Sequence, residues 1–143
     1  MCKTTVVSGY WSVKNKHSRG FDKWLDKTLK VNCPYIFFCD KSVTEEMRRC
    51  RGEYETYFID KSIDDFSLKI SERLPYSKEK YLHSRHVPSL ELGKIWLEKI
   101  FLVRDAVEIN PYDSEWFAWI DAGYAKNRKV EPSSLPWPDG EKT

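Results

Sequence analysis

Three short runs rich in apolar and β-branched residues each end at an aspartate, and this pattern limits the folds that the chain can adopt. The runs and their aspartates are Tyr35–Cys39 with Asp40, Glu55–Ile59 with Asp60, and Trp116–Ile120 with Asp121. A continuous apolar run of this length is typical of a strand covered on both faces, as in parallel sheets. A fourth run, Thr4–Tyr10, predicts the first strand. We therefore expect an α/β fold with a mostly parallel sheet flanked by helices.

Helical patterns separate these strands along the chain. The spacing of apolar residues predicts a short helix over Phe21–Leu29. The S-x-x-E capping box at Ser42–Glu45 predicts the start of a second helix, which ends at about Arg51. The longest helix is expected over Leu90–Asn110, because Ser89 is a suitable N-cap and a proline follows the last turn.

The long predicted helix carries a lysine near the middle of its apolar face. The residues assigned to this face by helical periodicity are Leu92, Ile95, Trp96, Ile100, Val103, Ala106 and Val107. Because Lys99 lies among them, its ammonium group would lose hydration unless an anion receives it. Asp121 or a bound phosphate would serve, and the alternative is that Lys99 extends to the helix edge and stays hydrated.

The aspartates at the strand ends define the candidate site. Neighbouring parallel strands end at the same edge of a sheet, so Asp40, Asp60 and Asp121 are expected together there. Ligands of open α/β sheets bind at this edge, and a carboxylate in that position can hold a metal or a sugar hydroxyl. The alternative is that Asp121 caps a turn or the next helix. Three neighbouring carboxylates repel one another unless a positive charge lies among them. A divalent cation, Lys99 or Arg51 would provide that charge.

Composition restricts the class of protein. The 143 residues predict one domain over residues 1–143, with a loop-rich tail over 124–143. A formal charge of +2 argues against nucleic acid as the partner of the basic residues Arg48, Arg49, Arg51, Lys126, Arg128 and Lys129. The N-terminus is too polar for a signal peptide and no run reaches membrane-spanning length, so we expect no transmembrane segment and a cytoplasmic protein.

Two segments without clear elements carry further candidates. The basic loop over residues 12–20 could hold phosphates or could simply be solvated. The stretch from 61 to 88 is expected to be a functional loop or a lid with short helices. Within it, His83 and His86 have a spacing that would suit one face of a helix, but no third metal ligand is near in the sequence.

The sequence resembles the HtrL/YibB-type family of glycosyltransferase-like proteins. In that family a lysine-bearing helix leads through an Asn-Pro-aromatic turn to a W-x-D-x-G strand end. The segments that carry the resemblance are Pro88–Leu92, Ile95–Lys99, Asp105–Glu115 and Trp119–Gly123, with weaker similarity at Thr4–Tyr10 and Phe38–Asp40. The resemblance covers nearly the whole chain and is most specific over residues 88–123.

This resemblance implies a GT-A-like, Rossmann-like nucleotide-sugar domain. Such enzymes use Mn²⁺ or Mg²⁺ to neutralise the leaving nucleotide, while a sugar passes from a nucleotide diphosphate sugar donor to a hydroxyl of a glycan or other acceptor. Asp121 matches the family's metal-binding aspartate, and Lys99 matches its helix lysine, which contacts the diphosphate or orients the aspartate.

Further donor-binding residues are predicted from their positions. Tyr10 and Asp40, at strand ends, would face the base and ribose. Gly9 would let the backbone approach the ligand, and Arg51 would contact phosphates together with the basic loop. No catalytic base is assigned, and Asp60 and Asp113 are the candidates.

Two departures from the family pattern keep a second interpretation open. The motif reads D-x-G instead of D-x-D, so a metal would need other ligands from the diphosphate, water or further protein. Members of the family are also longer, so we expect a minimal domain, or a fragment truncated at the C-terminus that binds the donor. The alternative is a non-catalytic α/β module that recognises a nucleotide, a glycan or a protein.

Overall fold

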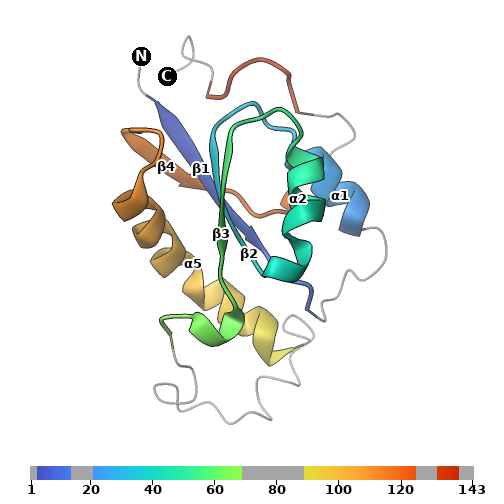
Figure 1. Ribbon diagram of the computed structural model, residues 1–143, viewed down its shortest axis with the longest axis vertical. Helices are drawn as coiled ribbons and strands as arrows, with labels where there is room; N and C mark the ends of the chain where they lie inside the picture. Colours follow the sequence, from blue (N-terminus) through green and yellow to red (C-terminus); the bar gives the residue numbers. More distant parts are fainter. Residues whose placement is uncertain (1–2, 14–20, 69–88, 125–131, 139–143) are drawn as a thin grey trace.

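The computed structural model describes residues 3–13, 21–68, 89–124 and 132–138 (Figure 1). Its strands are β1 (Thr4–Tyr10), β2 (Tyr35–Cys39), β3 (Thr56–Asp60) and β4 (Trp116–Trp119). They form one sheet in the order β3-β2-β1-β4, and each neighbouring pair is parallel. The predicted α/β class with a parallel sheet is therefore confirmed.

Helices cover both faces of this sheet. They are α1 (Phe21–Thr28), α2 (Thr44–Arg51) and α5 (Leu90–Ile109), with short 3₁₀ turns η1 (Lys41–Val43) and η2 (Ile63–Asp65). In Figure 1, α1 and α2 lie on one side of the strands and α5 on the other. Because strand side chains alternate between faces, β2 sends Tyr35 and Phe37 into the core beneath α1 and α2, and Ile36 and Phe38 into the core beneath α5.

Both helices begin within the predicted stretches, but the predicted N-cap was right for α5 and wrong for α2. Ser89 Oγ accepts a hydrogen bond from Leu92 N at 3.2 Å, as expected for an N-cap. The S-x-x-E box does not cap α2, because the 3₁₀ turn η1 precedes the helix and Ser42 lies inside that turn. Asp40 caps η1 instead, by accepting a hydrogen bond from Ser42 N at 3.0 Å.

The face that α5 buries agrees with the predicted one only in part, at Ile95 and Ala106. Ile95, Leu102 and Ala106 pack in the core, but Ile100 is 72% exposed and Trp96 is 42% exposed. The reason is Glu98, which is completely buried and accepts hydrogen bonds from Ser67 N (2.6 Å) and Leu68 N (3.0 Å). A prediction from hydrophobic periodicity places glutamate on the solvent side of a helix. The predicted apolar face was therefore centred away from Glu98.

The described part of the chain contains no helix that combines the length and the apolar character needed to cross a bilayer.

Candidate functional site

The carboxyl edge of the sheet, where the four strands end, carries the predicted acidic residues. Tyr10, Cys39 and Asp60 stand side by side in the strand register, and Asp40 follows Cys39 directly. Asp121 follows β4, on the other side of β1. Neighbouring strands are about 4.8 Å apart, and β4 ends opposite Val7 whereas β2 ends opposite Tyr10, so the ends of β2 and β4 are separated by more than about 10 Å. The edge therefore spreads its carboxylates out, and the described residues contain no group of three or more His, Cys, Asp or Glu that could hold a metal.

Asp121 is held in place by two donors on the same oxygen atom. Lys99 Nζ donates to Asp121 Oδ1 at 2.6 Å, and Trp119 Nε1 donates to the same atom at 2.7 Å. Lys99 also lies over the indole of Trp119, with Nζ 5.6 Å from the ring centroid. The carboxylate is thus oriented by α5 and β4 together, and no described residue donates to Oδ2.

The electrostatics of this pair favour the charged carboxylate. Partial burial raises the pKa of Asp121, but the hydrogen bonds from Lys99 and Trp119 and the charge of Lys99 outweigh it, so the pKa lies below its usual value. The Asp121 side chain is still 61% exposed. At neutral pH this position therefore presents a fixed, ionised and accessible acceptor.

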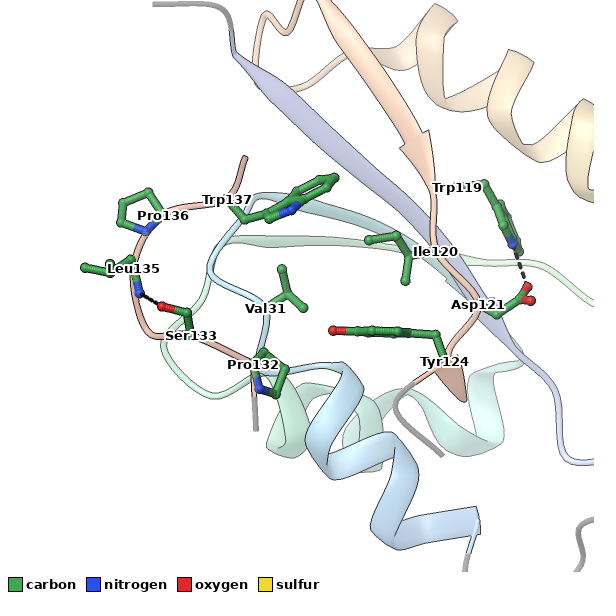
Figure 2. Close-up of a pocket in the computed structure, with 10 residues that line it drawn as sticks. All are labelled: Val31, Trp119, Ile120, Asp121, Tyr124, Pro132, Ser133, Leu135, Pro136 and Trp137. Carbon is green, nitrogen blue, oxygen red and sulfur yellow. Dashed lines mark hydrogen bonds between the residues drawn. The ribbon is translucent and has the colours of Figure 1, made fainter. Parts of the chain in front are cut away.

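Asp121 borders a pocket of about 640 Å³, which we call the Asp121 pocket (Figure 2). Its lining residues are Val31, Trp119, Ile120, Asp121, Tyr124, Pro132, Ser133, Leu135, Pro136 and Trp137. Figure 2 shows Asp121 and Trp119 at one side of the pocket, the 132–137 segment at the other, and the Tyr124 ring between them. Most of the described lining is apolar or aromatic, and Asp121 is the one charged residue among these described positions.

The segment that closes the pocket is fastened to the loop before β2. Trp137 N donates to Asn32 O at 2.8 Å, and Asn32 Nδ2 donates to Ser134 O at 2.8 Å. These two bonds join residues about a hundred positions apart in the sequence. This segment was predicted only as part of a loop-rich tail, and Trp137 between two prolines is the sequence feature that could have indicated its role.

A buried hydroxyl lies in the core close to Tyr124. Tyr35 Oη has no hydrogen-bond partner in the described structure, although its side chain is completely buried. Burial raises the pKa of Tyr35, the Arg51 guanidinium lowers it, and the proximity of the Tyr124 phenol adds to the rise. This unsatisfied hydroxyl is therefore influenced electrostatically by Tyr124, which lines the Asp121 pocket.

The structure gives Arg51 a role different from the predicted phosphate contact. Its guanidinium is buried and lies 3.9 Å from the centroid of the Tyr35 ring. It donates to Thr56 Oγ1 and to the carbonyl oxygens of Leu29, Val31, Cys33 and Glu55. These groups precede or begin β2 and β3, at the amino edge of the sheet. Arg51 is thus a structural residue on the edge opposite the candidate site.

The absence of a side chain at Gly9 is explained by packing, not by the predicted approach of a ligand. A Cβ atom at this position would lie 2.8 Å from two atoms of the Trp11 ring and 3.0 Å from Phe38 O. Trp11 is itself fixed, because its Nε1 donates to Lys61 O at 2.8 Å and its ring packs edge-on against Phe66. The space beside Gly9 is therefore already filled by the protein.

Tyr10 and Asp40 lie at the carboxyl edge, as predicted from the strand pattern. Tyr10 is half-buried and packs against the core beneath α1 and α2. The hydrogen bond from Ser42 N holds the pKa of Asp40 below its usual value. Capping of η1 accounts for Asp40 locally, and a contact with a nucleoside stays a prediction for both residues.

Other predicted positions lie outside the described residues. These are the basic loop from residue 14 to residue 20, His83, His86, and the basic residues Lys126, Arg128 and Lys129.

Comparison with known proteins adds no relative to this picture. The chain matches no protein-family model, no curated protein and no solved structure. The fold and site define an α/β domain with a four-stranded parallel sheet and an oriented carboxylate at its carboxyl edge. The resemblance to the HtrL/YibB-type family stays a prediction from the sequence.

Proposed function

We propose that this chain is the donor-binding domain of a glycosyltransferase of the GT-A type, which uses a nucleotide diphosphate sugar. The observation that carries the proposal is the Asp121 carboxylate, because Lys99 and Trp119 fix Oδ1 and leave Oδ2 without a described donor. This group lies at the sheet edge where α/β proteins bind ligands, and it borders a pocket large enough for part of a substrate.

A divalent cation fits this arrangement if the substrate supplies part of its ligands. Mg²⁺ in phosphate-binding sites is often held by one or two carboxylates together with substrate phosphates and water. The described residues offer one such carboxylate, Asp121, so Mn²⁺ or Mg²⁺ would bind together with the donor diphosphate. When bound, the ion would neutralise charge on the leaving nucleotide.

The chain's own contribution in this proposal is orientation. In the transfer, the acceptor oxygen forms a bond to the anomeric carbon, the bond from that carbon to the diphosphate oxygen breaks, and the acceptor proton passes to a base. Lys99 keeps Asp121 pointing toward the donor, and the aromatic wall of the Asp121 pocket excludes water from one side of the site.

The test is calorimetric titration of UDP and GDP into the protein, with and without Mn²⁺. We expect binding that requires the metal and that Asp121→Asn weakens at least tenfold. Asp26→Asn is the matched control, because Asp26 is similarly exposed (57%) and also pairs with a lysine, Lys30, but lies on α1. If neither nucleotide binds under either condition, the donor-site assignment is wrong.

A non-catalytic binding module is the second candidate. The spread of the carboxylates along the edge favours it, because the described residues build no metal site by themselves. Incubation with UDP-sugars and Mn²⁺ separates the two candidates: an enzyme of this class releases UDP over time, whereas a binding module retains the intact donor.

A further inference from the structure

We infer that the Asp121 pocket binds the ring of a neutral, unphosphorylated sugar, which stacks on its aromatic walls and donates a hydroxyl hydrogen bond to Asp121 Oδ2. This inference rests on the proposed function for its location, and it goes further by naming the part of the substrate that enters the pocket.

The aromatic lining is the first argument. Trp119, Tyr124 and Trp137 come from β4, from the turn after it and from the distant 132–138 segment, and they border one cavity. A sugar ring has faces of C–H groups that can lie against an aromatic ring, while its hydroxyls project from the rim. Pockets that bind small molecules commonly combine such apolar walls with a few placed polar groups.

In the absence of a metal ion, the charge of the described lining disfavours phosphate in the pocket. Among the described residues of the lining, Asp121 is the one ionised side chain, and Lys99 already donates to its Oδ1. A phosphate placed in the pocket would face a carboxylate without meeting an unpaired described cation, which is unfavourable where water is partly excluded. A hydroxyl group can instead donate to Oδ2, and a hydrogen bond to a charged acceptor is stronger than one between neutral groups.

The size and the construction of the pocket agree with this occupant. A volume of about 640 Å³ lies within the range of small-ligand sites and leaves room for one or two sugar rings. Both ends of the wall are anchored, because Tyr124 N donates to Asp121 O at 3.0 Å and Trp137 N donates to Asn32 O at 2.8 Å. The aromatic rings are therefore attached to backbone that hydrogen bonds hold in place.

The experiment is saturation-transfer NMR on the full chain in buffer with EDTA, using glucose, galactose, mannose, N-acetylglucosamine, lactose and maltose as probes. We expect saturable transfer from at least one sugar. Trp137→Ala and Asp121→Asn should each weaken that binding at least tenfold, whereas Trp137→Phe should retain most of it. Trp96→Ala is the matched control, because Trp96 and Trp137 are equally exposed (42%) but Trp96 lies on α5, outside the lining.

The outcomes separate this inference from the proposed function. Absence of transfer from every sugar, or binding that Trp137→Ala leaves unchanged in a folded variant, overturns the inference even if UDP or GDP binds. Tighter binding of inorganic phosphate than of any sugar at the pocket also overturns it. Sugar binding without nucleotide binding supports the inference about the Asp121 pocket and contradicts the proposed donor site. Saturable binding of free disaccharides indicates an acceptor glycan as the occupant. Binding of UDP-sugars alone overturns the inference, because no unphosphorylated sugar then occupies the pocket.

Discussion

The two edges of the sheet each hold a cation, and the two cations are used in opposite ways. At the amino edge, Arg51 is buried and makes five hydrogen bonds to backbone carbonyls and one threonine. At the carboxyl edge, Lys99 is partly exposed and donates to a single carboxylate oxygen, Asp121 Oδ1. The first arrangement is closed, because every donor direction points at protein. The second is open, because its carboxylate retains an oxygen for something else.

This contrast teaches how to separate structural charges from functional ones in one small domain. A buried cation surrounded by acceptors stabilises the fold and has no capacity for a ligand. A fixed but accessible ion pair adds little to stability and can still bind. Substitutions at the two edges should therefore differ in their effects on unfolding and on binding.

The largest loss of stability is expected for Arg51→Met. The substitution leaves the carbonyls of Leu29, Val31, Cys33 and Glu55 without this donor in a buried place, which should lower the free energy of unfolding by about 4 kcal/mol. Urea unfolding measures the change. Arg49→Met, an exposed position on the same helix, should stay within about 0.5 kcal/mol of the natural protein. Equal effects of the two substitutions would contradict the structural role of Arg51.

A smaller loss of stability is expected for Glu98→Ala. This substitution tests whether a buried carboxylate that accepts two backbone hydrogen bonds also stabilises the fold. Ser67 N and Leu68 N would lose their acceptor, and we expect a cost of about 2–3 kcal/mol. Hydrogen exchange of these two amides should accelerate together with the loss in urea unfolding. Glu108→Ala, an exposed position on α5, is the control, and unchanged exchange at residues 67 and 68 would refute the contact.

Gly9→Ala should cost about 2 kcal/mol, because the new methyl group overlaps the Trp11 ring in a packed region. A double-mutant cycle with Trp11→Phe measures the coupling between the two positions. If packing explains Gly9, the smaller ring should relieve part of the cost, and sugar or nucleotide binding by Gly9→Ala should be nearly unchanged. A loss of binding without a loss of stability would restore the predicted ligand contact at Gly9.

The smallest effect on stability is expected at Asp121, and it should depend on pH. The pKa of Asp121 is lower in the folded protein than in the unfolded chain, so its stabilising contribution is present above about pH 4 and is lost as the pH falls through the folded value. Because the side chain is largely exposed, we expect only about 0.5 kcal/mol. The difference in unfolding free energy between the natural protein and Asp121→Asn should therefore shrink between pH 7 and pH 2. A difference that stays constant over this range would argue against the ion pair.

Local patterns in the sequence were enough for the strands and for part of the site. β1 and β2 lie where the apolar runs predicted them, and Ser89 caps α5 as its position before the helix indicated. The partnership of Lys99 with Asp121 was also open to prediction, because a lysine on the helix before β4 needs a carboxylate and the strand ends in one. These features depend on backbone propensity, on burial of short runs and on elements that are neighbours in the chain.

Only the tertiary structure decided which polar groups are buried and which remain available. Glu98 looks solvent-facing by periodicity, yet it binds amides some thirty residues earlier in the chain. Arg51 looks like a free cation, yet carbonyls from before β2 and β3 surround it. The Asp121 pocket needs the segment around Trp137, which is held by Asn32. The physical reason is the same in each case: a hydrogen-bond partner distant in the sequence changes the cost of burying a polar group, and no local pattern records where that partner lies.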